Sequence, residues 1–132
     1  MPELSEQQRA FLDNPFVGVV TTLRRDGSPH STVVWVDSLD GKAAFNTALG
    51  RVKPRNMERD PRVSLLVLDP GDPYRWLSVD GRIEITEEGA DDHIDRLAKK
   101  YVGADSYPNR KPGEVRVTVT IDATRVDAHG ID

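Results

Sequence analysis

Residues 16–36 read FVGVVTTLRRDGSPHSTVVWV, two runs rich in valine and threonine on either side of an Asp-Gly pair. β-branched residues favour strands, because their side chains pack well on a pleated surface. Asp26-Gly27 supplies residue types that tolerate the positive φ angles of a tight hairpin turn. The stretch therefore predicts two antiparallel strands, residues 16–23 and 30–36.

The same alternation of β-rich runs and turn residues continues along the chain. A second Asp-Gly pair, Asp40-Gly41, follows the strand at 30–36 and predicts that a third strand completes a meander. Gly81 interrupts an alternating run and marks a bulge or a close approach of two backbones. Residues 115–121 alternate apolar with polar side chains, which is typical of a half-buried strand. The later strands are predicted at residues 42–46, 63–68, 74–85 and 115–121, with 124–128 extending the last one.

Three helices are predicted. Ser5 followed three residues later by Gln8 matches a capping box and predicts a helix over residues 5–13. Apolar residues within 87–102 recur at helical spacing, which predicts a helix with one buried stripe. A short helix is predicted near 55–60, between two prolines.

Six or seven short strands with these three helices indicate a mainly β protein that contains some α structure. The expected fold is a closed or nearly closed antiparallel barrel with helices at its ends. The length of 132 residues predicts one domain, 1–132. A barrel this small gains from covering an exposed face with a second copy, so a homodimer is expected.

Composition excludes several classes of function. The chain has no cysteine, which rules out disulfides, thiolate metal sites and cysteine nucleophiles. A net charge of -4 provides no field to attract nucleic acid or anionic lipid. No apolar run approaches the roughly 18 residues of a membrane span. Glu3 and Glu6 precede any apolar run, unlike a secretory signal, so a cytoplasmic location is expected.

The histidines do not form a recognisable site. His30, His93 and His129 are scattered, without the spacing of metal ligands, so no metal is expected. His93 is expected on the polar face of the helix at 87–102. No nucleophile elbow or paired carboxylates indicate hydrolase chemistry.

A basic segment is the strongest indication of a binding site. Residues 50–62, GRVKPRNMERDPR, contain five cations and two anions in an otherwise acidic chain. Arg51 and Lys53 follow a strand that ends in Asn46-Thr47, and together these groups could hold a phosphate. A helix starting near Arg55 would add free backbone N–H groups. From the residues alone, a solvated loop with internal salt bridges is an equal alternative.

The run FNTALGRVK at 45–53, with Arg55-Asn56-Met57 and residues 59–63, resembles the pyridoxamine 5′-phosphate oxidase-like superfamily. Within that superfamily it is most similar to the actinobacterial branch of F420-dependent oxidoreductases. The resemblance extends over nearly the whole chain. Further matching segments are residues 21–24, 26–30, 74–77, 81–82, 89–94, 99–101, 107–108 and 111–114.

The resemblance implies a split β-barrel homodimer with a cofactor groove between the subunits. It places the ring of the cofactor along the strand that contains Trp35, and the phosphate on the basic segment. It places Trp76 where flavin oxidases of the family have a glutamine, which implies a packing or stacking role. The cofactor-binding residues so implied are Ser31, Thr32, Val33, Val34, Asn46, Thr47, Arg51, Lys53, Arg55 and Trp76.

The resemblance also bears on the choice of cofactor. In the flavin oxidases an arginine and a lysine are adjacent after a serine, whereas here Gly50 replaces the serine and Val52 separates the cations. That departure favours coenzyme F420 over FMN. The implied function is hydride transfer from reduced deazaflavin to an unsaturated or quinone-like small molecule, with no catalytic residue assigned. The alternatives are an FMN-binding reductase or oxidase of the same fold and a non-catalytic cofactor- or haem-binding module.

Overall fold

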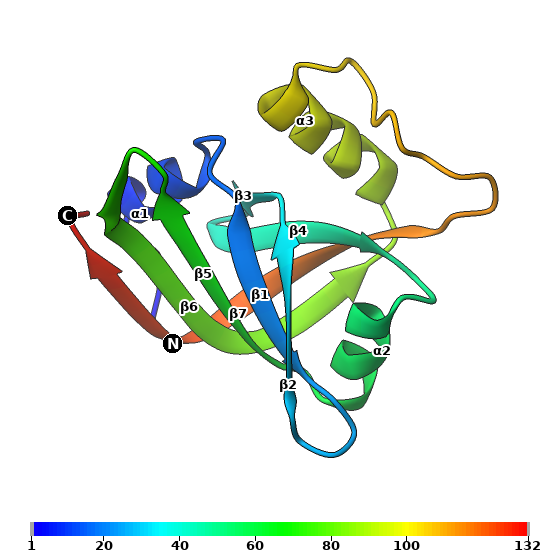
Figure 1. The fold of residues 1–132 in the computed structure, drawn as a ribbon, viewed down its shortest axis with the longest axis horizontal. Coiled ribbons are helices and arrows are strands. Elements are labelled where there is room, and N and C mark those ends of the chain that lie inside the picture. The colour runs from blue at the N-terminus through cyan, green and yellow to red at the C-terminus, as the bar shows by residue number, and fades with distance from the viewer. Residues whose placement is uncertain (1, 132) are drawn as a thin grey trace.

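The computed structural model describes residues 2–131 and shows one curled antiparallel sheet with three helices around it (Figure 1). The sheet has the strand order β2-β1-β5-β6-β7-β4-β3, and its curl forms a half-barrel. This confirms the mainly β, split-barrel expectation. The strands are β1 (Gly18–Leu23), β2 (Pro29–Val34), β3 (Val36–Leu39), β4 (Lys42–Ala48), β5 (Arg62–Asp69), β6 (Asp72–Thr86) and β7 (Arg116–His129). The helices are α1 (Glu6–Leu12), α2 (Val52–Arg59) and α3 (Ala90–Val102).

The helices begin where their local chemistry allows. The Ser5 hydroxyl accepts the Gln8 N–H at 3.1 Å and the Gln8 side chain accepts the Ser5 N–H at 2.9 Å, so the predicted capping box is confirmed. α2 begins at Val52 rather than near residue 55, with Arg51 at its N-cap. Pro54 therefore lies in the first turn, where its missing N–H costs no helical hydrogen bond. None of the helices in residues 2–131 is long and apolar enough to cross a membrane.

The predicted hairpin at residues 16–36 forms, but its second strand is shorter than expected. β1 and β2 pair from Gly18 with Val34 to Leu23 with Pro29. The chain then leaves the sheet at Trp35, and β3 pairs with β4 instead. β2 and β3 occupy opposite edges of the sheet, so the predicted three-stranded meander is wrong. β-branched runs predict strands but not their partners, and here β7 provides the neighbour of β4.

β6 and β7 are the long strands that join the two halves of the sheet. Their pairing shifts between Asp80 and Gly81, which confirms the predicted bulge. A Cβ at Gly81 would lie 2.1 Å from the Asp122 carbonyl oxygen, so only glycine fits. β7 is continuous over both predicted segments, and its first four residues, 116–119, are all buried. The half-buried prediction is wrong there, because the barrel core covers one face and α3 packs against the strand.

The inner face of the sheet forms the apolar core. Phe45, Leu65, Leu77 and Ile121 are at most 1% exposed and come from four different strands. Burying each such side chain contributes about 1.5–3 kcal/mol relative to exposure. Leu12 of α1 joins the same cluster, and the core holds the sheet edges in place around the candidate site.

Candidate functional site

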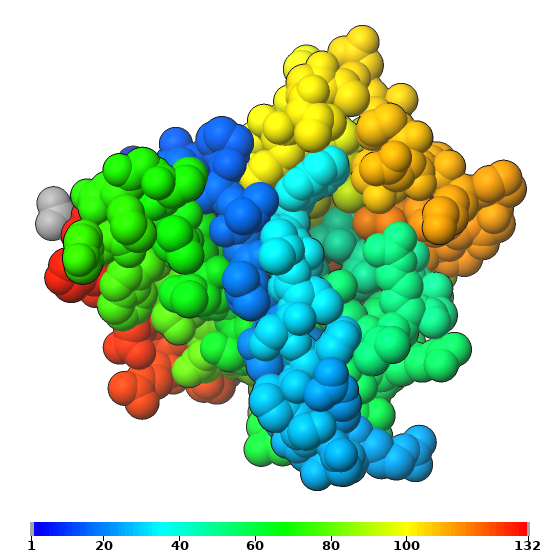
Figure 2. Space-filling view, in the orientation of Figure 1, coloured from blue at the N-terminus to red at the C-terminus, as the bar shows by residue number. Residues whose placement is uncertain are grey.

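A hollow of about 190 Å³ lies beside the junction of β2 and β3. α3 and the loop after it form one side, and the start of α2 forms another. Figure 2 shows the face of the molecule on which β2, α2 and the α3 region meet. The residues that line the hollow are Val33, Val34, Trp35, Asn46, Arg51, Lys53, Ile94, Leu97, Tyr107, Asn109 and Arg116.

One wall of the hollow is apolar and partly aromatic. Ile94 and Leu97 come from the buried stripe of α3. The Trp35 ring stacks on Tyr101 with centroids 5.3 Å apart and planes at 5°, and it meets the Tyr107 ring edge-on at 6.1 Å. Such ring pairs are rigid, so this wall suits a flat, apolar group.

A second, adjoining wall of the hollow is cationic. Arg51 and Arg116 both pair with Glu114, at 3.4 and 3.2 Å. The side-chain ammonium of Lys53 has no hydrogen bond or ion pair with any residue of the described part of the chain. Burial lowers the pKa of Lys53, and the neighbouring Arg51 and Arg116 guanidiniums lower it further. Glu114 therefore pairs with two of the three cations, and the excess positive charge suits an anionic ligand.

Arg116 is a site residue that sequence reasoning missed. Its side chain is only 3% exposed, its Nε donates to Asn46 Oδ1 at 2.8 Å, and its guanidinium lies 5.1 Å from the Tyr107 ring centroid. The alternation at 115–121 predicts a solvent-facing side chain at this position. The available signal for a site residue was that Arg116 is the one charged residue beside Thr118 and Thr120 on that face of the predicted strand.

The structure brings half of the implied cofactor residues together. Val33, Val34, Asn46, Arg51 and Lys53 all line the hollow, although they come from three separate parts of the chain. Two cations of the basic segment, Arg51 and Lys53, therefore face the hollow, whereas Arg62 forms an internal ion pair with Asp60.

The other half lie outside the lining. Ser31 is hydrogen-bonded to Thr21 across the hairpin at 2.9 Å. Arg55 is exposed on α2. Trp76 lies on β6, where its ring stacks on His129 at 6.2 Å.

Thr32 and Thr47 carry buried hydroxyls that have no hydrogen-bond partner. Each is the direct neighbour in sequence of a lining residue, Val33 or Asn46. An unsatisfied buried polar group costs about 1–3 kcal/mol and needs an explanation. Neither threonine lines the hollow, however, because successive side chains of a strand point to opposite faces. Within the lining, the unpaired Lys53 is the group that an anionic cofactor would complete.

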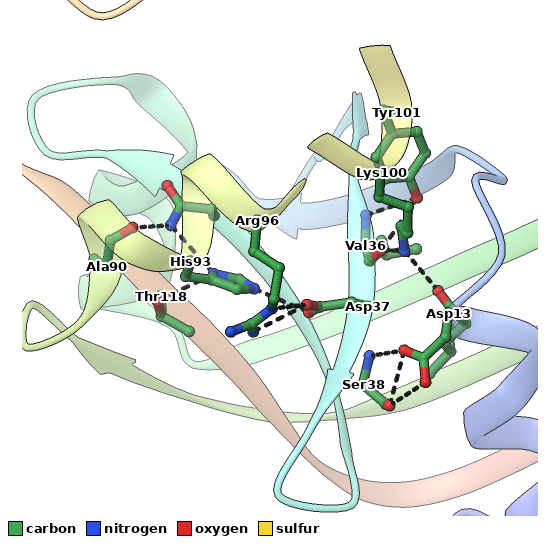
Figure 3. A network of polar contacts seen from close by, with 12 residues as sticks. Asp13, Val36, Asp37, Ser38, Ala90, His93, Arg96, Lys100, Tyr101 and Thr118 are labelled. Atoms are coloured by element: carbon green, nitrogen blue, oxygen red, sulfur yellow. Dashed lines mark hydrogen bonds and ion pairs between the residues drawn. The ribbon is translucent and has the colours of Figure 1, made fainter. Parts of the chain in front are cut away.

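Behind the cationic wall lies a buried polar network centred on His93 (Figure 3). The expected position of His93 on the polar face of the helix is wrong, because the residue is 2% exposed. Its Nε2 lies 2.9 Å from Asp37 Oδ1, and Arg96 donates to Asp37 Oδ2 at 3.1 Å. His93 stands three residues after Ala90 and four before Leu97, so the helical spacing itself places it on the buried stripe.

The chain is similar to known proteins over nearly its whole length. The chain is 32% identical over 126 residues to the F420H(2)-dependent biliverdin reductase of Mycobacterium tuberculosis, a match that covers 93% of this chain and 86% of that protein. It is 27% identical over 129 residues to the pyridoxine/pyridoxamine 5′-phosphate oxidase of Escherichia fergusonii, covering 97% of this chain and 54% of the oxidase. It thus spans about half the length of that oxidase.

A solved structure titled F420 Reductase superposes with a TM-score of 0.78 at 29% identity, covering 94% of this chain and 98% of that one. The sequence profile of the pyridoxamine 5′-phosphate oxidase family matches residues 4–129. Because this match spans nearly the entire chain, the protein belongs to the pyridoxamine 5′-phosphate oxidase family.

Proposed function

We propose that this protein is an F420-dependent oxidoreductase that reduces an unsaturated or quinone-like small molecule. The observation that carries the proposal is the unpaired Lys53 in a cationic wall that adjoins a flat apolar wall. The similarity to a reductase named for F420H(2) supports the choice of cofactor. When bound, the reduced deazaflavin supplies a hydride to the substrate.

The residues of the hollow have separate tasks in this proposal. Arg51 and Lys53 would bind the anionic end of the cofactor through charge-assisted hydrogen bonds. Val33 and Val34 would hold its ring, and Trp35 would exclude water from one side.

Tyr101 does not serve as a proton donor in this proposal. Its hydroxyl donates to the Phe16 carbonyl at 2.5 Å, and burial raises the pKa of Tyr101 to about 12. In this proposal the proton that completes reduction comes from solvent.

The site is proposed to be completed by a second copy of the chain. A hollow of about 190 Å³ is smaller than the roughly 300–1,000 Å³ of most ligand sites. Val33, in the strand beside it, is 67% exposed. Val33 pairs with Val19 and Val19 with Leu66, so the three side chains form an apolar row across β2, β1 and β5. A homodimer would cover this row and deepen the hollow into a groove.

Fluorescence titration of the purified protein with F420 and, separately, with FMN tests the proposal. We expect F420 to bind more tightly. Arg51→Ala and Lys53→Met should each weaken F420 binding, because each removes a charge-assisted contact of about 1.5–3 kcal/mol, or roughly 10- to 150-fold in affinity. Lys99→Met, an exposed lysine late in α3, is the matched control and should bind like wild type.

The thermal stability of the same variants separates binding from folding. Lys53→Met removes a half-buried charge that has no partner, so the Tm of the ligand-free variant should equal or exceed that of wild type. Equal F420 affinity in wild type and both variants, or a clear preference for FMN, would contradict the proposal.

A further inference from the structure

The guanidinium of Arg116 is held on several sides and still has free donors. Nε donates to Asn46 and Nη1 donates to Glu114. No acceptor for Nη2 is found within residues 2–131, and Arg116 lines the hollow. Because a guanidinium has five N–H groups, donors remain for a ligand in the hollow.

The orientation of the Asn46 amide is determined by its two neighbours. Its Oδ1 faces the Arg116 Nε, which can only donate, at 2.8 Å. Its Nδ2 donates to the Ala90 carbonyl, which can only accept, at 2.9 Å. A reversed amide would place donor against donor and acceptor against acceptor, so the Asn46 carbonyl must face Arg116.

His93 completes this arrangement. Asn46 Nδ2 and Thr118 Oγ1 lie 3.2 and 3.1 Å from His93 Nδ1, and Nε2 faces the Asp37 carboxylate, which can only accept. We therefore assign the tautomer in which Nε2 carries the proton and Nδ1 accepts. Nε2 then donates to Asp37 Oδ1 at 2.9 Å, and Figure 3 shows His93 directed toward Asp37 from α3. Asp37, His93, Asn46 and Arg116 are each at most 8% exposed. They form one buried chain of hydrogen bonds that ends at the cationic wall.

We propose that Arg116 is a third cationic contact for the anionic end of the cofactor, and that Asn46 and His93 are positioning residues that hold its guanidinium in the binding orientation. The inference rests on the proposed function, since it concerns the same ligand. Asp37 holds the His93 ring so that Nδ1 faces Asn46, which adds a further contact to an amide that Arg116 and Ala90 already orient. Without this support the guanidinium would be free to turn toward Glu114, which already accepts from it.

Two ligands that differ only at the anionic end provide the test. One is F420, and the other is its deazaflavin-ribityl fragment, which lacks the phosphate and the tail. Arg116→Gln should lower the affinity for F420 at least tenfold and leave the affinity for the fragment within twofold. His93→Phe should lower the affinity for F420 three- to tenfold, again without affecting the fragment. His129→Phe, an exposed histidine at the end of β7, is the control and should bind both ligands like wild type.

A double variant tests whether His93 acts through Arg116. Residues that act as one unit are not additive, so His93→Phe should cause no further loss of F420 affinity in the Arg116→Gln background. His93→Gln, whose amide can still donate to Asp37, should lose less than His93→Phe. If His93→Phe does not fold, Asn46→Ser takes its place in the cycle with Arg116→Gln, and the same loss of F420 affinity is measured.

The outcomes separate this inference from the proposed function. If wild type binds F420 and Arg116→Gln binds it equally well, the inference is overturned while the proposed function stands. The positioning role is overturned if the losses of F420 affinity in His93→Phe and Arg116→Gln add in the double variant. It is also overturned if His93→Phe weakens binding of the fragment as much as binding of F420. If wild type binds only FMN, the proposed cofactor is wrong. Comparing the affinities of Arg116→Gln for FMN and for riboflavin, which lacks the phosphate, then tests Arg116 in the same way.

Discussion

Tyr101 ties the C-terminal end of α3 to β3 and to the segment before β1. Its hydroxyl donates to the Phe16 carbonyl at 2.5 Å and accepts the Val36 N–H at 3.0 Å. Its ring stacks on Trp35, which forms part of the apolar wall. One side chain therefore positions both the helix and the wall of the hollow.

We predict that Tyr101→Phe lowers the free energy of unfolding by about 1–3 kcal/mol, because it leaves a buried donor and acceptor unsatisfied. Urea denaturation measures this, and Tyr74→Phe, at a residue 76% exposed, should change stability by less than about 0.5 kcal/mol. A Tyr101→Phe midpoint equal to that of wild type would refute the anchoring role.

The same residue predicts a loss of stability at alkaline pH. Burial raises the pKa of Tyr101 to about 12 from an ordinary value of 10.0, so the unfolded chain releases the phenolic proton first. Stability should then fall as pH rises from about 10 to about 12, and less so in Tyr101→Phe.

At the scale of elements, the pairing of β6 with β7 determines the curl of the sheet. The two strands remain paired from Trp76 with His129 to Thr86 with Thr118, and they shift register once, at Gly81. A bulge increases the local twist of a strand pair. The register shift therefore lets β6 and β7 bend and run through both halves of the barrel.

Gly81→Ala should reduce the free energy of unfolding by about 2–3 kcal/mol, because its Cβ would meet the Asp122 carbonyl oxygen at 2.1 Å and the backbone must move. Gly71→Ala is the matched control. Its Cβ would approach a single side-chain atom, Asp69 Oδ1, at 3.3 Å and no backbone atom, so urea denaturation should show a much smaller change. Equal stability of the two variants would contradict the close approach at the bulge.

At the scale of the whole molecule, one face of the sheet exposes apolar side chains. Val33 is 67%, Leu66 40% and Leu68 36% exposed, and all three lie on β2 or β5. Contiguous exposed apolar surface of this kind commonly marks a protein interface. The proposed homodimer would use this face.

Light scattering should therefore give a mass twice the 14.7 kDa of one chain. Leu66→Asp should shift the protein to a single chain and weaken F420 binding, because a buried carboxylate opposes association and the groove loses one side. Val102→Asp, at a residue 57% exposed at the end of α3, should remain a dimer. A wild type that is a single chain yet binds F420 with full affinity would disprove the shared groove.

The features that the amino-acid sequence determined by itself are local. The capping box at Ser5, the Asp-Gly turns, the stripe of α3 and the short helix near 55–60 all depend on residues within a few positions of one another. Propensity, spacing and charge act over that range, which is why these predictions were confirmed or, for the length of α2, nearly so.

Only the tertiary structure decided which local pieces meet. Asn46 and Arg116 are 70 residues apart, and His93 and Asp37 are 56 apart, yet each pair is hydrogen-bonded in the interior. β4 pairs with β7 on one side and with β3 on the other, so β3 lies at the edge of the sheet opposite β2. Such pairings depend on packing both faces of a curled sheet at once, and no property of a short segment encodes that.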